Sequence, residues 1–200
     1  MLLLVLAGTL ILPQIRIQYG YFLDNALNRN ESATALSEYE LNQKAETYTK
    51  AWGEFEKQIL EEMMSLLNLE FNQNIVDVFV VNRVNGSFSN PMVITAKYSP
   101  DEFVDALAHE LVHRLLTDNT RRVNPYEYLR KKYPNETVIV ANHILVHAIM
   151  RYLYIDVLRA PERLARDIDK SQKYPSYRRA WEIVGAEGYK KIISSFRKTY

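Results

Sequence analysis

The chain has 200 residues, 48% of them hydrophobic and 24% charged, so it is long and apolar enough to bury the core of one globular domain. Its net charge of +1 offers no electrostatic attraction to nucleic acid, and we expect no nucleic-acid partner. The absence of cysteine excludes disulfides and thiolate metal ligands, so any metal site must use histidine and carboxylate side chains. A chain without cysteine fits the reducing cytoplasm, where we expect the protein to be located.

The beginning of the chain has two interpretations. Residues 2–12 are strongly apolar but too short to span a bilayer, and no basic segment precedes them. Isoleucine and tyrosine then alternate with other residues from Ile15 to Tyr21, which predicts a β-strand. We therefore expect a sheet strand or a hairpin at the start of the fold. A signal segment or membrane anchor, which would attach the protein to a membrane or lead to its secretion, is the alternative.

A long helix is predicted after the polar, asparagine-rich residues 24–34, which predict a loop. Ser37 and Glu40 have the spacing of a capping box at a helix start. Apolar residues then recur at steps of three and four, and this pattern continues to about Asn68. We expect one uninterrupted helix whose apolar face packs on the core.

Two buried strands are predicted before the next helix. β-Branched residues dominate residues 74–81, and residues 92–98 form a second apolar run. The second strand is either a plain structural edge or an edge that pairs with an extended peptide. It leads into a helix with a clear start, because Ser99 and Glu102 form another capping box. We expect this helix to end near residue 118.

That helix carries the sequence His109-Glu110-Leu111-Val112-His113. Residues four apart share one face of a helix, so His109 and His113 can bind one metal ion together. Glu110 lies beside that position, where it can take a proton from a metal-bound water. The motif therefore indicates metal-assisted hydrolysis.

The only other histidines, His143 and His147, are also four apart on a predicted helix. We expect this helix to run from Glu136 to Arg159, with Asn135 as its cap. It is apolar nearly all round and should be buried. Burying two imidazoles without partners would cost about 1–3 kcal/mol each, so a metal for one and a hydrogen bond for the other would stabilise the pair. A hydrogen-bonded core pair is the alternative.

The rest of the chain carries less chemistry. The basic stretch at residues 121–133 is expected to be a solvated connection, although its cations have the charge to contact an acidic substrate. Three short helices are expected at residues 162–171, 176–184 and 189–196. We assign these helices to packing and expect no chemistry from them.

The motif helix after a strand, with a second histidine-bearing helix downstream, resembles the zincin metallopeptidases, and among them the gluzincins, whose smallest members are called minigluzincins. The resemblance covers roughly residues 37–158. It implies an α+β, zincin-like fold, mostly helical with a small sheet, in which a long backing helix and a buried ligand helix flank the active-site helix. We expect a single domain over residues 1–200, with an N-terminal strand and loop segment at 1–36, a catalytic core at 37–158 and a helical extension at 159–200.

In that clan the ligand helix carries Asn-Glu-x-x-x-Asp, and the comparable stretch here begins at Asn142 and places histidine at both acidic positions. The resemblance implies that Zn²⁺ is bound by His109, His113 and His143. His147 would then take the place of the aspartate that orients the first histidine of the motif. Three imidazoles bind zinc well, but the roles of His143 and His147 can also be reversed.

The function implied is a zinc metallopeptidase that hydrolyses peptide bonds in a peptide or protein substrate, with Glu110 as general base and acid. The donor to the oxyanion is open among four candidates: Tyr152, Tyr154, Arg151 and His147. Residues 10–21 could add a strand to the sheet or lie across the cleft as an inhibitory segment. One alternative is an inactive zincin-fold binding module whose structural zinc is closed by both His143 and His147, and another is a metal-free helical scaffold.

Overall fold

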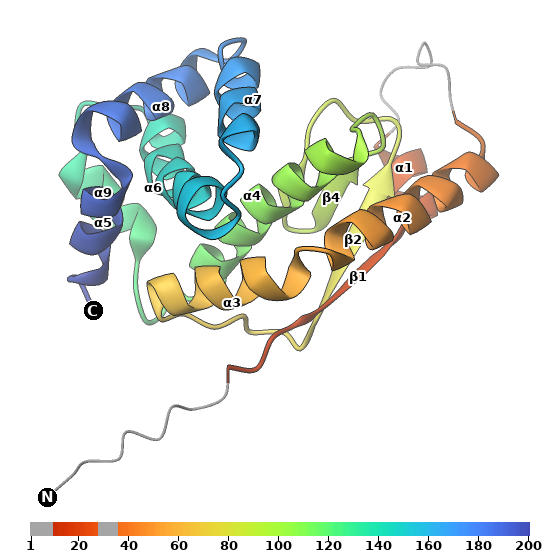
Figure 1. The fold of residues 1–200 in the computed structure, drawn as a ribbon, viewed down its shortest axis with the longest axis horizontal. Coiled ribbons are helices and arrows are strands. Elements are labelled where there is room, and N and C mark those ends of the chain that lie inside the picture. The colour runs from red at the N-terminus through yellow and green to blue at the C-terminus, as the bar shows by residue number, and fades with distance from the viewer. Residues whose placement is uncertain (1–9, 28–35) are drawn as a thin grey trace, which may run out of the picture.

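The computed structural model describes residues 10–27 and 36–200 (Figure 1). Its described part is a mixed α+β fold, mostly helical, with one small sheet. Within that part the sheet has the strand order β1-β2-β4-β3. β1 and β4 both run parallel to β2, and β3 is antiparallel to β4. The strands are β1 (Gln14–Tyr19), β2 (Ile75–Val81), β3 (Phe88–Ser89) and β4 (Met92–Thr95).

The predicted N-terminal strand is confirmed as β1, which pairs with β2 along its whole length and forms no hairpin. It ends before Tyr21, however, because the chain turns into the short helix α1 (Tyr21–Ala26). The buried Asp24 side chain accepts hydrogen bonds from the backbone N–H groups of Asn82 and Arg83, which ties α1 to the end of β2. The prediction of a loop at residues 24–34 is therefore wrong for residues 24–26, which belong to α1. Its remainder, and most of the apolar stretch at residues 2–12, lie outside the described residues.

The long backing helix is two helices, α2 (Glu38–Gly53) and α3 (Glu56–Leu67). The predicted capping box at Ser37 is present, and α3 ends as expected at Asn68, which has a left-handed backbone conformation. The prediction of one uninterrupted helix is wrong because the helix breaks after Gly53, the residue type with the highest backbone entropy cost in a helix. The apolar stripe continues across the break, so the sequence pattern alone does not show it.

The strand before the motif helix is shorter than predicted. β4 ends at Thr95, and the following residues form a turn held by the Tyr48 hydroxyl, which donates to the carbonyl oxygens of Ala96 and Tyr98. β4 lies inside the sheet, between β2 and β3. The edge that we considered for peptide pairing is therefore covered by β3 at Met92 and Val93.

The motif helix α4 (Pro100–Asp118) begins with the predicted capping box at Ser99 and ends where the sequence predicts. Its apolar face is fully buried at Leu107, Leu111 and Leu115. The stretch predicted as a solvated connection contains a helix, α5 (Pro125–Lys132), which Asn124 caps through a hydrogen bond from Glu127 N–H. Arg121, Arg130 and Lys131 are exposed, so the stretch is solvated as predicted, but the helix was not predicted from the sequence.

The second histidine helix, α6 (Val138–Tyr152), is buried as predicted. Its cap is Thr137, whose hydroxyl accepts from Val140 N–H, and the predicted cap Asn135 lies two residues too early. A π-helix, η1 (Leu153–Val157), follows it directly. Residues 138–157 are long and apolar enough to cross a membrane, but 67% of the most apolar window is buried inside the fold, as in a core helix.

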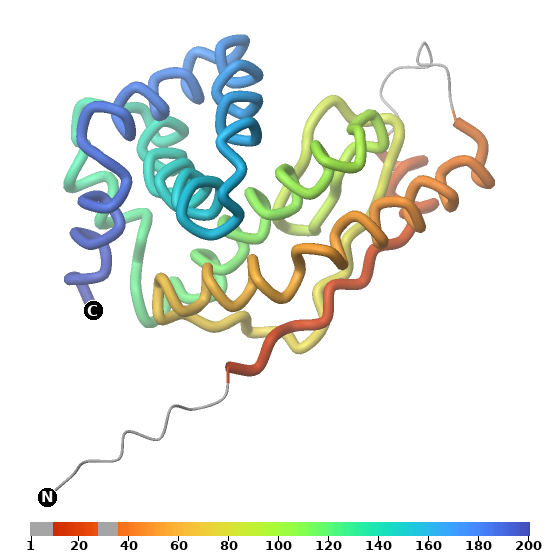
Figure 2. Tube along the Cα trace, in the orientation of Figure 1, coloured from red at the N-terminus to blue at the C-terminus, as the bar shows by residue number. Residues whose placement is uncertain are grey.

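The last three predicted helices are confirmed as α7 (Pro161–Ser171), α8 (Pro175–Glu187) and α9 (Tyr189–Arg197). Gly188 forms the junction before α9 with a positive φ of 89°, and α8 continues beyond its predicted end at residue 184, so Gly185 lies inside it. The helical half of the molecule surrounds α6, which contacts α4 on one side and α8 and α9 on the other (Figures 1 and 2).

An ion-pair cluster joins the C-terminal helices to the motif helix. The Arg163 side chain on α7 is 7% exposed and donates to Asp105 Oδ1 at 2.7 Å and to Asp101 Oδ1 at 2.8 Å. Arg166 binds the second carboxylate oxygen of Asp105. Asp105 lies one helical turn before His109, so this cluster fixes α7 against the part of α4 that carries the histidines.

Replacing Asp105 with alanine should lower the free energy of unfolding by about 3 kcal/mol, because the substitution leaves two guanidinium groups, one of them buried, without their shared carboxylate. Urea denaturation of the metal-free protein measures the change. Asp101→Ala is the matched control. The Asp101 side chain is 65% exposed, so its loss should cost about 1 kcal/mol or less. Equal costs for the two variants would contradict the role given to Asp105.

Candidate metal centre

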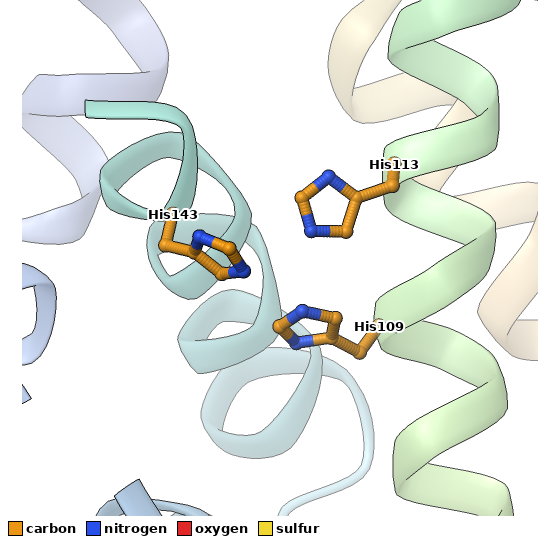
Figure 3. Close-up of side chains that lie close together, drawn as sticks. All are labelled: His109, His113 and His143. Atoms are coloured by element: carbon orange, nitrogen blue, oxygen red, sulfur yellow. The ribbon is translucent and has the colours of Figure 1, made fainter. Parts of the chain in front are cut away.

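Three imidazoles meet between α4 and α6 (Figure 3). His109 and His113 project from successive turns of α4, and His143 faces them from α6. One nitrogen of each ring lies within 4.8 Å of the other two. The ring centroids are 5.0 Å apart for His109 and His113, 5.0 Å for His113 and His143, and 5.5 Å for His109 and His143. The structure therefore brings together one side-chain group that can bind a metal ion.

The three side chains fit a tetrahedral ion with small adjustments. Zn–N bonds of 2.0–2.1 Å place the ligand nitrogens about 3.3 Å apart, so small side-chain rotations inward would complete the site. His143 makes a hydrogen bond that already leaves its Nε2 atom free to bind a metal ion. Its Nδ1 lies 2.8 Å from the carbonyl oxygen of Ile139, so Nδ1–H donates and Nε2 keeps its lone pair for the metal.

Burial keeps these rings in the form that binds metals. Desolvation and the neighbouring imidazoles lower the pKa of His109 well below its ordinary value. The same causes lower the pKa of His113 to about 3, and burial also lowers the pKa of His143. All three rings are therefore neutral at pH 7, and a neutral imidazole has the free lone pair that a metal requires.

The same environment shifts the pKa of Glu110 upwards, in the opposite direction to the histidines. Burial raises the pKa of its carboxyl group to about 7. The carboxyl lines a cavity of about 390 Å³ together with His109. A carboxyl group with a pKa near neutrality can both accept and release a proton at pH 7, as a general base and acid must.

Residues of the C-terminal helices α7 and α8 also line this cavity, so these helices do more than the packing on the core that we expected of them. Tyr177 on α8 lies with its ring centroid 4.2 Å from that of His143 and 6.4 Å from that of His109. Trp181, one turn later, stacks on His147 at 4.4 Å with an angle of 12° between the rings. Tyr177 and Trp181 are four apart, as are the two histidines that they face, and this matching spacing is the signal that sequence reasoning missed.

His147 lies beside the group of three and does not belong to it. Its side chain is completely buried, and neither ring nitrogen has a hydrogen-bond partner among the described residues. Burial and the neighbouring imidazoles lower its pKa well below the ordinary value. Asn142 is half-buried, and its Oδ1 also lacks a partner in the described part of the chain.

Three of the four predicted oxyanion donors point elsewhere. The Tyr152 hydroxyl donates to Glu62, and the Tyr154 hydroxyl donates to Asp167. The guanidinium group of Arg151 lies over the ring of Tyr189. None of these three lines the cavity, whereas His147 does. Described residues 10–27 do not line the cavity either, so within that range the N-terminal segment forms a sheet strand and does not cross the site.

Comparisons with family models, with curated proteins and with solved structures found no match to this chain. The functional interpretation therefore depends on the geometry and chemistry of the site.

His143→Ala should weaken binding of Zn²⁺ at least about 100-fold, because it removes one of three metal-binding nitrogens. His147→Ala, the matched control on the same helix, should retain binding. Elemental analysis and competition with a chelator measure both affinities on protein purified identically. Loss of metal only in His147→Ala would reverse the roles of the two residues.

The raised pKa of Asp167 predicts that the free energy of unfolding changes with pH. Burial raises the pKa of its carboxyl group to about 6 from an ordinary value of 3.8. The protonated carboxyl group of Asp167 is therefore favoured in the folded state over the unfolded state. Its contribution to the free energy of unfolding is complete below pH 3.8 and is lost as the pH rises through 6. Asp167→Asn should remove this loss, which is up to about 1.4 kcal/mol per pH unit.

Urea denaturation of the metal-free protein at several pH values between 4 and 7 measures this effect. The buried histidines have lowered pKa values and produce the opposite slope, but they contribute to both proteins. The difference between the two curves therefore isolates Asp167. A constant difference across this range would contradict the raised pKa.

Proposed function

We propose that the protein is a zinc-dependent metallopeptidase that hydrolyses peptide bonds. The observation that carries this proposal is the convergence of His109, His113 and His143 beside the half-buried carboxyl group of Glu110, at the wall of a cavity. Three neutral imidazoles and no thiolate form a ligand set well suited to zinc. Three ligands, with a cavity beside them, leave room for a substrate.

His109, His113 and His143 would hold the zinc ion, which would supply a water molecule with a pKa lowered towards about 7. Glu110 takes the proton as the water attacks the peptide carbonyl carbon. It then gives this proton to the leaving amine when the C–N bond breaks. Burial raises the pKa of Glu110 in the metal-free protein, so desolvation makes this carboxylate a stronger base than an exposed one, which supports its role in both transfers.

Tyr177 is the best candidate for the donor that stabilises the oxyanion. It lines the same cavity as His109 and Glu110, and its ring packs beside His143. Burial raises the pKa of its phenol, so the hydroxyl keeps its proton and can donate a hydrogen bond to the negative oxygen of the tetrahedral state. Of the four donors considered from the sequence, only His147 also lines the cavity, and we favour Tyr177 over it.

Glu110→Gln should retain zinc and lower kcat at least about a hundredfold, because the amide cannot accept a proton. Hydrolysis of an unstructured protein substrate, measured beside the zinc content, tests this expectation. Glu46→Gln, which changes an exposed carboxylate on α2, should behave as the wild type. Unchanged proteolysis by Glu110→Gln would exclude Glu110 as the general base.

Tyr177→Phe should lower kcat about a hundredfold with little change in KM or zinc content, because the lost hydrogen bond forms only as the oxyanion develops. Tyr174→Phe is the matched control, since Tyr174 lines the same cavity and its ring lies 5.6 Å from that of Tyr177. We expect a much smaller effect at this more exposed position. Equal losses in the two variants would argue against a specific role for Tyr177.

A further inference from the structure

A fourth imidazole lies within reach of the metal position. The ring centroid of His147 is 5.8 Å from that of His109 and 5.5 Å from that of His143. These separations are close to those within the group of three, which are 5.0–5.5 Å. Both ring nitrogens of His147 are buried and have no hydrogen-bond partner in the described part of the chain, so no hydrogen bond competes with a metal ion for their lone pair. His147 is outside the group whose nitrogens lie within 4.8 Å of one another, so its ring would have to rotate to supply a fourth protein ligand.

A four-histidine site would have a different chemistry. Zinc sites with four protein ligands are structural, whereas catalytic sites keep one position for water or substrate. The chain must therefore keep His147 away from the ion if the site is to act on a substrate.

Trp181 is the side chain placed to do this. Its indole ring is stacked on His147 almost parallel, with 4.4 Å between the ring centroids and 12° between the planes. Tyr177 meets the same imidazole edge to face at 5.9 Å. Rotation of His147 towards the metal would break the stack with Trp181, so the stack restrains the ring in its present orientation.

Trp181 is itself fixed by a chain of hydrogen bonds. Its Nε1–H donates to Ser171 Oγ at 3.2 Å, and the Ser171 hydroxyl donates to Asp167 Oδ1 at 3.4 Å. The Tyr154 hydroxyl donates to the other oxygen of Asp167. The indole is thus held from α7, and it would lose this hydrogen bond if it moved with His147.

We propose that Trp181 is a positioning residue that holds His147 away from the metal by ring stacking and so leaves the fourth coordination position free. This inference rests on the metal site of the proposed function but not on the reaction that the site performs. It gives the C-terminal helices a role in metal coordination, because the ligand count depends on a residue of α8.

The test compares Trp181→Leu, Trp181→Phe, His147→Leu and the double variant Trp181→Leu with His147→Leu. Affinity for Zn²⁺ is measured by competition with a chelator, and the coordination of Co²⁺ by its visible absorption. Trp181→Leu should bind Zn²⁺ about tenfold more tightly, change the cobalt spectrum and lose peptidase activity, because His147 enters the site. The double variant should return to the wild-type affinity and spectrum. Trp181→Phe, which retains an aromatic face, and His147→Leu alone should both resemble the wild type.

The direction of the affinity change separates this role from simple packing. A site that is only loosened by the loss of Trp181 would bind Zn²⁺ more weakly, and removal of His147 would not restore it, a result that would overturn the proposal. If Trp181→Leu does not fold, Ser171→Ala replaces it, since this change keeps the indole ring but removes the acceptor of its N–H, together with the hydroxyl that donates to Asp167. It should give a smaller increase in affinity, which His147→Leu abolishes; no increase would overturn the proposal.

The same measurements distinguish the two proposals. A wild type that binds Zn²⁺ but hydrolyses no peptide would refute the proposed function, while the affinity and cobalt spectra would still decide the role of Trp181. Hydrolysis by the wild type, with no affinity increase in Trp181→Leu, would refute only the inference about Trp181.

Discussion

The site depends on the withdrawal of four imidazoles and one carboxyl group from water between α4, α6 and α8, which is complete for His147 and partial for His109, His113 and Glu110. Desolvation disfavours charge, so it keeps the histidines neutral and lowers the pKa of His113 to about 3. The same desolvation raises the pKa of Glu110 to about 7. One environment thus produces lone pairs for a metal and a carboxyl group that exchanges protons near neutral pH. A cation at the centre would satisfy several of these buried groups at once.

The period of the α-helix organises this interior. His109 and His113 lie one turn apart on α4, and His143 and His147 repeat that spacing on α6. Tyr177 and Trp181 repeat it again on α8, where each ring faces one histidine of α6. The ion pairs of Arg163 with Asp101 and Asp105 hold the C-terminal helices against α4. A helical extension that the sequence suggested was only packing therefore becomes one wall of the site.

The sequence predicted local structure correctly where a few neighbouring residues decide where a helix begins. The capping boxes at Ser37 and Ser99 form as expected because cap and partner are three residues apart. Predictions failed where local options compete. Asn135 and Thr137 are both good cap residues, and α6 begins after Thr137. The break after Gly53 leaves the apolar stripe intact, so periodicity could not reveal it.

The sequence by itself determined the two histidine pairs, the position of Glu110 beside the first pair, and the burial of the second, since these follow from helical spacing and local hydrophobicity. Only the tertiary structure decided that His143 joins His109 and His113 while His147 stacks on Trp181. Residues four apart on one helix are equivalent in the sequence pattern. The approach and rotation of α6 against α4 and α8 make them different, and those depend on packing between segments that are distant along the chain.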